Sequence, residues 1–235
     1  MGRAIVTRLV GCGLRVLAVA RDGQRLADLT ANSSTVTACE ADISDDAAIA
    51  TVAAAIDGPV RVVVHGPGVP TAGGVLEAPT SALTEAMNIK VCGMLRVVRA
   101  VDAHLVTGSR LVAIGGHYGF EPSAYAATAG VANAAISNLI RQLSWAYGPR
   151  GITTHLLAPG PADTERLRRV AQARADREGC SLEVVLTTLQ AESAIGAFTS
   201  VDQIAWAIET LLAPEADALA GSTLFMDAGR RRGLP

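Results

Sequence analysis

The hydrophobic pattern of the chain alternates short apolar runs with longer segments in which apolar residues recur at helical spacing. Short apolar runs bounded by glycine, proline or polar residues are typical of buried strands, and the longer periodic segments are typical of amphipathic helices. The predicted strands are 15–20, 60–64, 111–114, 151–157 and 219–229. The predicted helices are 2–10, 45–56, 81–103, 125–145, most of 165–193 and a last helix from 200. Strands that alternate with helices predict a parallel sheet covered by helices.

The composition fits this fold class. Half of the residues are apolar but only 3% are aromatic, so Ala, Val, Leu and Ile must fill the core. Such a core suits helices that pack closely on a parallel sheet. A chain of 235 residues is long enough for one α/β domain, and no repeat or linker divides it. We therefore predict a single domain over 1–235.

Charge and cysteine usage exclude several classes of function. The net charge of −2 gives no general attraction to nucleic acid or to an anionic membrane. The four cysteines are scattered without a C-x-x-C pair, so neither a disulfide framework nor a metal site is indicated. Reduced cysteines, together with the lack of a targeting signal, predict a cytoplasmic protein. The uncharged run at 122–140 is as long as a membrane span, but its small and polar residues favour a helix inside a soluble protein.

The stretch from 111 to 129 holds the most promising chemistry. A buried strand, Leu111–Ile114, is followed by a glycine-rich loop at 115–119 and then by a helix, introduced by Pro122, that carries Tyr125 near its start. An open α/β sheet places its reactive groups just beyond the carboxyl ends of its strands. Tyr125 is therefore a candidate catalytic residue, and the alternative is a partly buried tyrosine of the helix.

This stretch resembles the active-site segment of the short-chain dehydrogenase/reductase family. There a Ser-Ser pair closes the strand and Tyr-x-x-x-Lys opens the helix, whereas this chain combines Tyr125 with Gly115-Gly116 and Ala129. The resemblance implies that the tyrosine exchanges a proton with the substrate oxygen. A tyrosine titrates near ~10, so it needs a nearby cation to act as a base at neutral pH. Ala129 cannot supply that charge, and Gly116 cannot supply a hydroxyl.

Two neighbours of the loop offer a replacement for the missing hydroxyl. His117 and Tyr118 are both hydrogen-bond donors, and either could polarise a carbonyl in place of the serine. His65, which stands with Gly66 where the family has a pair of asparagines, is interpreted as a structural histidine and not as a base.

The resemblance extends along essentially the whole chain. The matching positions, in order, are Asp42, Gly68, Asn88, Tyr125, Pro159, Gly160, Thr164 and Asp227. It implies a Rossmann-like, doubly wound parallel sheet flanked by helices. It also implies a homodimer or homotetramer, because in the family the two long central helices pack against their copies in a second subunit.

Several of these positions are implied to bind a dinucleotide. Arg21 follows Ala20, which holds the position of the family's acidic residue, and this pattern favours NADP(H) over NAD(H). The alternative for Arg21 is an exposed arginine that opens a helix. Asp42 and Ile43 match the step that contacts adenine, although Asp42 is equally suited to cap the following helix. Gly68 matches the glycine of the next cofactor-side turn.

Three further positions match the catalytic half of the family's site. The Pro159-Gly160 turn and Thr164 correspond to residues that border the nicotinamide. Asn88 corresponds to an asparagine that kinks its helix and holds a water of the proton relay, and a mid-helix asparagine is unfavourable without a partner. The segment 165–196 occupies the place of the family's variable substrate lid. Its arginines fit either an anionic or acyl-carrier-bound substrate or a solvated face.

The beginning of the sequence departs from the family pattern. Residues 2–20 resemble the family's first helix and second strand, so the first strand and the glycine-rich loop of the fold are missing. The missing strand would lie in the middle of the sheet and leave two unpaired strand edges. Either about a dozen upstream residues are absent from this sequence or the fold is rearranged, and we favour the first explanation.

Two functions are consistent with this pattern. The first is an NAD(P)(H)-linked carbonyl reductase or alcohol dehydrogenase acting on a small molecule, with weak activity because of Gly116, Ala129 and the absent glycine-rich loop. The alternative is a non-catalytic relative that serves as an oligomer partner or a ligand-binding subunit. No nucleic acid, membrane or metal partner is predicted.

Overall fold

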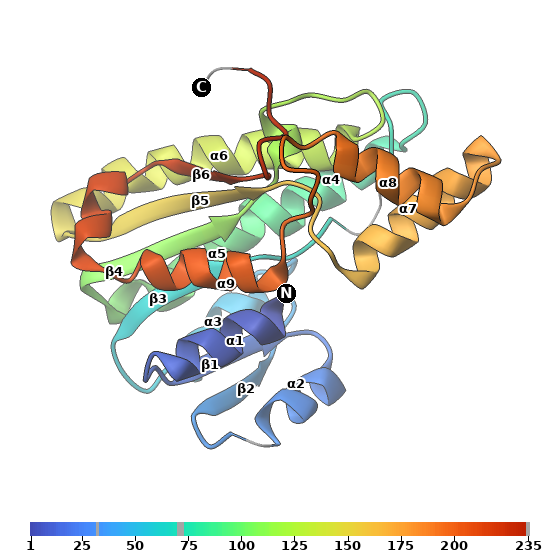
Figure 1. The fold of residues 1–235 in the computed structure, drawn as a ribbon. Coiled ribbons are helices and arrows are strands. Elements are labelled where there is room, and N and C mark those ends of the chain that lie inside the picture. Colours follow the sequence, from blue (N-terminus) through green and yellow to red (C-terminus); the bar gives the residue numbers. More distant parts are fainter. Residues whose placement is uncertain (32, 70–72, 234–235) are drawn as a thin grey trace.

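The computed structural model describes residues 1–31, 33–69 and 73–233, and its strands all run parallel with helices on both sides (Figure 1). The strands are β1 (Val16–Ala20), β2 (Val36–Glu40), β3 (Val60–His65), β4 (Leu105–Ile114), β5 (Thr153–Pro159) and β6 (Thr223–Met226). β1 pairs with β2, and a second sheet has the order β3-β4-β5-β6. The predicted parallel α/β fold is confirmed.

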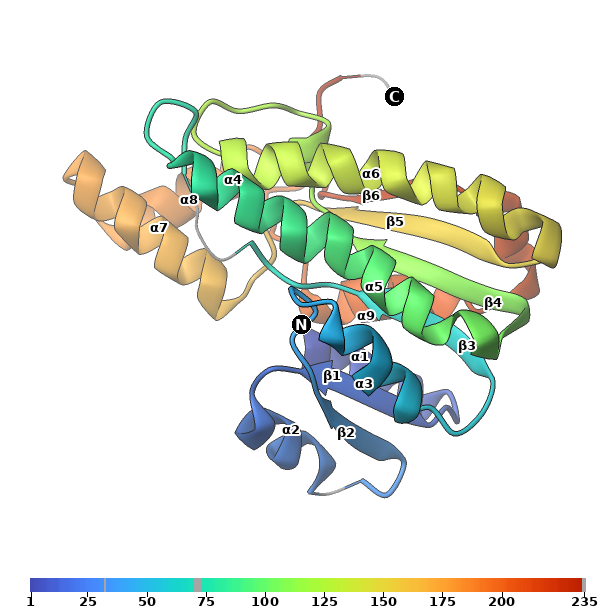
Figure 2. The same ribbon diagram turned by 180° about the vertical axis from the view of Figure 1, so that it is seen from behind.

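Helices cover both faces of the larger sheet. The α-helices of the described residues are α1 (Gly2–Gly11), α2 (Gly23–Thr30), α3 (Ala47–Ala54), α4 (Thr80–Met87), α5 (Gly93–Val101), α6 (Ala127–Tyr147), α7 (Glu165–Glu178), α8 (Leu182–Ala191) and α9 (Val201–Thr210). In Figure 1, α9 lies in front of the sheet, with α1 below it. The view from behind shows α4, α5 and α6 on the opposite face (Figure 2). Helices α7 and α8 project to one side, beyond the end of β5.

The two faces of β4 contact different helices, because successive side chains of a strand point to opposite sides of the sheet. Leu111 packs with Met94 of α5 and Ile140 of α6. Its neighbour Val112 packs with Ile208 of α9 on the other face. All of these side chains are buried. The continuous apolar run at the end of β4 is therefore explained by burial on both faces.

The sheet is divided between β1 and β3. Among the described residues β1 pairs only with β2 and β3 only with β4, so each has one edge without a strand partner. Two such edges are what the sequence predicts when the middle strand of the fold is missing. Ile5 and Leu9 of α1 are buried in one cluster with the partly buried Val16 of β1 and Val62 of β3. Side-chain packing, instead of backbone hydrogen bonds, joins the two parts.

The helix predicted over 81–103 is interrupted at Asn88. Residues Asn88–Cys92 form a turn of π-helix between α4 and α5. Single π turns inside α-helices are frequent at functional sites. The helix is therefore irregular at Asn88, the position at which the resemblance implies a kink.

Tyr125 does not lie in the helix that was predicted to carry it. Helix α6 begins at Ala127, and the chain makes a turn before it in which the Ala126 N–H donates to the Ser123 carbonyl at 3.1 Å. The Ala124 carbonyl accepts from the Val75 N–H at 2.7 Å, so it is occupied by a contact outside the helix. The prediction of a helix from 125 was wrong: α6 begins two residues later, because the Ala124 carbonyl is held by this tertiary contact.

The last helix, α9, begins with a capping box. The Ser200 hydroxyl accepts from the Gln203 N–H at 3.0 Å, and the Gln203 side chain accepts from the Ser200 N–H at 2.8 Å. We expect Ser200→Ala to lower the free energy of unfolding by about 1 kcal/mol, because one N–H at the helix start loses its acceptor. Urea unfolding measures this change. Thr187→Ala, at an exposed position inside α8, is the matched control, and an equal loss in both variants would contradict the capping argument.

The described part of the chain lacks two further features. None of its helices is long and apolar enough to cross a bilayer. Nor does it contain a group of three or more His, Cys, Asp or Glu side chains arranged to hold a metal ion. Cys12, Cys39, Cys92 and Cys180 are free thiols.

Candidate active site

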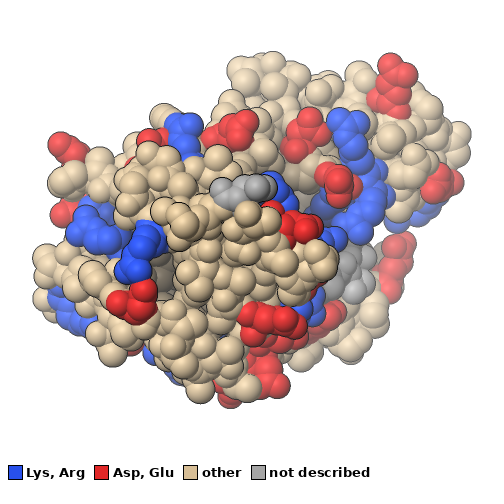
Figure 3. Space-filling view, turned by 90° about the horizontal axis from the view of Figure 1, so that it is seen from below, with Lys and Arg blue, Asp and Glu red and all other residues tan. Residues whose placement is uncertain are grey.

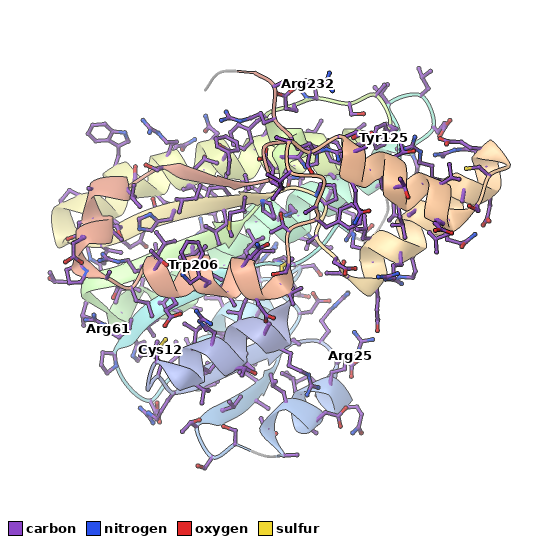
Figure 4. The ribbon with its side chains drawn as sticks, viewed as in Figure 1. Cys12, Arg25, Arg61, Tyr125, Trp206 and Arg232 are labelled. Atoms are coloured by element: carbon purple, nitrogen blue, oxygen red, sulfur yellow. The ribbon has the colours of Figure 1, made fainter. Side chains whose placement is uncertain are left out.

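Two tyrosine hydroxyls meet beyond the end of β4. Tyr125 lies at the end of the molecule where α8 begins to project (Figure 4), and its side chain is half exposed. Its hydroxyl is hydrogen-bonded to the hydroxyl of Tyr118, which belongs to the glycine-rich loop. The two rings meet edge to face, with centroids 5.5 Å apart. Tyr125 is thus part of a hydroxyl pair.

A buried arginine stands behind this pair. Burial raises the pKa of Tyr118 to about 12, the contact with Tyr125 adds to this rise, and the Arg230 guanidinium opposes it through a hydrogen bond and its charge. Arg230 is buried, donates to the Leu189 carbonyl at 2.9 Å and forms an ion pair with Glu192. Residues of the chain terminus and of α8 therefore fix a cation beside the hydroxyl of Tyr118.

Asn133 of α6 fills the space in which the family's serine side chain would begin. A Cβ on Gly116 would lie 2.8 Å from Asn133 Nδ2 and 3.7 Å from the Pro159 carbonyl oxygen. Asn133 is buried, and its Oδ1 has no hydrogen-bond partner among the described residues. A side-chain amide from the next helix therefore lies where Gly116 has no hydroxyl.

His117 is buried in the same loop as a neutral imidazole. Burial lowers its pKa to about 4, the charge of Arg230 lowers it further, and Asp227 and a hydrogen bond to the Pro159 carbonyl oppose the change. Its Nε2 has no partner among the described residues. Because the other ring nitrogen donates to the Pro159 carbonyl, the free Nε2 of the neutral ring is a hydrogen-bond acceptor, and His117 does not serve as a cation at neutral pH.

The turn after β5 is tightly packed. The Gly160 N–H donates to the Met226 carbonyl at 3.0 Å, and a Cβ on Gly160 would lie 3.0 Å from Asp227 Cα. The Thr164 hydroxyl caps α7 by accepting from the Leu167 N–H at 3.3 Å. Pro159, Gly160 and Thr164 therefore lie together at the carboxyl end of β5 and at the start of α7.

A buried lysine approaches the site from the π turn. Lys90 Nζ donates to the Ile114 carbonyl, the last of β4, at 2.9 Å. Burial lowers the pKa of Lys90 to about 8, and the charge of Arg166 lowers it further. His65, at the end of β3, donates from Nε2 to the Lys90 carbonyl at 3.0 Å. His65 therefore has a structural hydrogen bond, in agreement with its interpretation from the sequence.

The residues predicted to meet the adenosine half of a dinucleotide gather at the carboxyl ends of β1 and β2. Asp42 accepts from the Ser44 N–H at 2.9 Å and from its hydroxyl at 2.7 Å, and these bonds lower the pKa of the Asp42 carboxyl. Arg21 lies 3.7 Å from Asp42, and both side chains are largely exposed. Asp42 therefore closes a local turn and does not cap α3, whose first flanking residue is Asp46.

Asn88 belongs to this same half of the site. Its Nδ2 donates to the Ser44 carbonyl at 2.9 Å, and its Oδ1 accepts from Arg96 at 2.9 Å. Arg96 also donates to the Ile43 carbonyl at 2.9 Å. The structure thus joins Asn88, Asp42 and Ile43 through Ser44 and Arg96. Among the described residues, the Asn88 side chain bonds to Ser44 of this loop and to Arg96 of α5, and not to Tyr125.

Sequence reasoning missed several members of the site. Asn133 and Arg230 belong to no sequence motif. Arg230 lies far from Tyr125 in the sequence, and Asn133 lies on a helix of small residues. The one available signal for Asn133 was a polar residue on the otherwise small, apolar face of its helix. Lys90 and Arg96 carried a comparable signal, because a charged side chain within an apolar helix needs a partner.

Known proteins match this chain over nearly its full length. The family model described as "Enoyl-(Acyl carrier protein) reductase" matches residues 1–231. The short-chain reductase protein NovJ of Streptomyces niveus is 26% identical over an alignment of 242 positions that covers 98% of this chain and 89% of NovJ. The structure of a short-chain dehydrogenase/reductase from Serratia marcescens BCRC 10948 is 27% identical, with a TM-score of 0.85, and the match covers 97% of this chain and 92% of that one.

A third similarity is one of fold. The NADPH-bound structure of a short chain oxidoreductase from Pseudomonas aeruginosa PAO1, which contains an atypical catalytic center, has a TM-score of 0.86 at 21% identity. The match covers 98% of this chain and 92% of that one. At this identity the similarity is one of fold, and NADPH is the ligand of that neighbour.

Proposed function

Because this chain belongs to the short-chain dehydrogenase/reductase family, we propose that it is an NAD(P)(H)-linked reductase of small carbonyl compounds with Tyr125 as its proton donor. The observation that carries the proposal is the chain of groups from Tyr125 through Tyr118 to Arg230. A hydroxyl that donates to substrate and is itself hydrogen-bonded to a second hydroxyl beside a cation is suited to release a proton.

The protein's part in the reaction follows from this geometry. When bound, the reduced nicotinamide supplies the hydride. The Tyr125 hydroxyl donates its proton to the carbonyl oxygen, on which negative charge develops as the carbon is reduced. Tyr118 can return a proton to Tyr125 along their hydrogen bond, and the positive charge of Arg230 stabilises the anion that this leaves on Tyr118. Because burial raises the pKa of Tyr118 to about 12, its hydroxyl is protonated at neutral pH and has a proton to give.

We expect this activity to be weak. Gly116 offers no hydroxyl to polarise the carbonyl, and Ala129 offers no cation beside Tyr125. Groups of these kinds typically contribute on the order of 10² or more each to a rate. The Asn133 amide next to Gly116 is a neutral donor that replaces only part of this contribution.

The chain's own residues fit an anionic dinucleotide. The buried ammonium of Lys90 lies at the end of β4, and a cavity of about 410 Å³ at the start of α7 is lined by Thr164 and Arg166. Pro159 and Gly160 would border the nicotinamide, and Gly68 would border the adjacent part of the cofactor. Asp42 and Ile43 would contact the adenine. The exposed guanidinium of Arg21 supports NADP(H) over NAD(H), because it could pair with a 2′-phosphate.

Fluorescence titration with NADPH and with NADH tests the proposal at the binding step, and a panel of aldehydes, ketones and enones tests turnover. We expect saturable NADPH binding that is tighter than NADH binding, with slow, measurable reduction. Arg21→Gln should remove the difference between the two cofactors, whereas Arg25→Gln, at the next arginine of the same exposed surface, should not. Binding without any turnover would favour the non-catalytic, ligand-binding alternative, in a homodimer or homotetramer.

A further inference from the structure

Lys90 carries a buried positive charge without a carboxylate. It is the only lysine of the chain, it is 5% exposed, and its Nζ donates to the Ile114 carbonyl. Among the described residues, the titratable and charged groups that face it are His65 of β3 and Arg166 of α7, and neither is negative. Burying an ammonium group without a counter-charge costs free energy. The uncompensated charge of Lys90 therefore points to the binding of an anion.

Arg166 brings a second cation to the same place. β3 and β4 pair with His65 opposite Ala113, so Gly66 lies opposite Ile114, whose carbonyl holds Lys90. Gly68 is two residues further on, and a Cβ there would collide with the Arg166 guanidinium. Lys90 from the π turn and Arg166 from α7 therefore approach the ends of two adjacent strands.

No ion pair among the described residues includes Lys90 or Arg166. Arg166 is half-buried and lines the cavity of about 410 Å³ together with Arg169. Two carboxylates, Asp163 and Glu165, also line this cavity, and Asp163 is paired with Arg168 at 3.2 Å. Seen from below, basic side chains gather on the side of the molecule that holds α7, with acidic ones between them (Figure 3).

We propose that Lys90 and Arg166 form a two-cation site for a phosphate group, which in the proposed function is the pyrophosphate of the dinucleotide. A guanidinium binds phosphate oxygens in a bidentate manner, and an ammonium acts on them as a point charge. The site would replace, with side chains, the backbone amides that a glycine-rich turn offers to a pyrophosphate. It also links the ligand to α7, since Arg166 is the second residue of that helix.

The single lysine allows a direct test. Protein labelled with 13C at the lysine Cε gives one lysine signal, whose shift follows the ionisation of Lys90. Free protein should titrate with a pKa of about 8, in line with the burial of the ammonium and the charge of Arg166. Saturating inorganic pyrophosphate should raise this pKa by about one unit or more, because a nearby anion stabilises the charged form.

Arg166→Gln separates a specific site from a general charge effect. We expect it to weaken pyrophosphate binding at least tenfold and to raise the pKa of Lys90 in the free protein. Arg177→Gln, which removes an exposed charge in the last turn of α7, is the matched control and should change neither. A Lys90 signal that does not respond to pyrophosphate, or an equal effect of the two variants, would overturn the proposal.

NADPH binding and turnover of the same variants distinguish this inference from the proposed function. Arg166→Gln should weaken NADPH binding by a similar factor. Normal NADPH binding and turnover in Arg166→Gln would overturn the two-cation site and leave the reductase proposal intact. Pyrophosphate binding that raises the pKa of Lys90, in a protein that binds neither NADPH nor NADH, would support the anion site and contradict the cofactor assignment.

Discussion

Acidification from pH 7 to pH 5 should lower the free energy of unfolding by about 6 kcal/mol, which is a large part of the stability of a typical domain. The cause is three buried histidines, His65, His117 and His155, whose pKa values burial lowers to about 4. Each one is at most 4% exposed. The charge of Lys90 adds to the shift of His65, and the charges of Arg230 and Arg110 add to those of the other two.

The sign follows from the protons bound by each state. An unfolded histidine titrates near ~6.5, so between that pH and about 4 the unfolded chain binds more protons than the native one. Stability conferred by keeping the rings neutral is therefore complete above pH 6.5 and is lost as the pH falls towards 4. Each histidine contributes a slope of about 1.4 kcal/mol per pH unit, and three together contribute about 4.

Urea unfolding at intervals between pH 7.5 and pH 4.5 measures this slope. His65→Asn keeps a side-chain N–H that can donate to the Lys90 carbonyl, and it should reduce the slope by about one third. His104→Asn, at the only histidine outside the buried set, should leave the slope unchanged. A free energy of unfolding that stays constant between pH 7 and pH 5 would show that these rings are not held neutral.

Tyr125→Phe should lower kcat for carbonyl reduction by about 10² to 10⁴, because positioned acid–base groups contribute rate factors of that size. NADPH affinity should remain within about twofold, since the Tyr125 hydroxyl is hydrogen-bonded to Tyr118 and not to a residue of the proposed cofactor site. Tyr118→Phe should lower kcat by roughly tenfold, the value of one hydrogen bond. The measurements are steady-state rates and fluorescence titrations on the same preparations.

Tyr147→Phe is the control for this series. Its ring lies at the far end of α6, with the Arg150 guanidinium 5.2 Å from its centroid, and it takes no part in the proposed site. It should retain the rate of the unaltered protein. If Tyr125→Phe and Tyr147→Phe reduced the substrate equally well, Tyr125 would not be the proton donor.

Most of the strands and helices could be predicted from the sequence because local pattern determines them. The exceptions are β2, whose side chains are mostly exposed, and α2, which buries only Leu26. Buried strands are recognised in the sequence as apolar runs. Ser200 followed by Gln203 indicates a helix start without any tertiary information. The division of the sheet could also be predicted, since the position of the absent strand follows from the order of the elements. By contrast, the start of α6 depends on the contact between Val75 and the Ala124 carbonyl, which no local pattern reveals.

The catalytic half of the site could be predicted only in part. Tyr125 was found because it occupies a recognisable position after β4, whereas the groups around it come from distant parts of the chain. Arg230 reaches Tyr118 from the chain terminus, and Asn133 reaches Gly116 from the middle of α6. A sequence pattern identifies a residue that is missing, but only the fold shows which side chain occupies its place.

Deuterium transfer from NADPH labelled at nicotinamide C4 tests the central claim most directly, because it detects even a few turnovers. The enzyme is incubated with each labelled stereoisomer of the cofactor and a panel of carbonyl compounds, and the products are examined by mass spectrometry. We expect deuterium on the carbon of the product alcohol from one stereoisomer only, with at least a hundredfold less product from Tyr125→Phe. Saturable NADPH binding without label in any product would contradict reductase activity and favour a ligand-binding role.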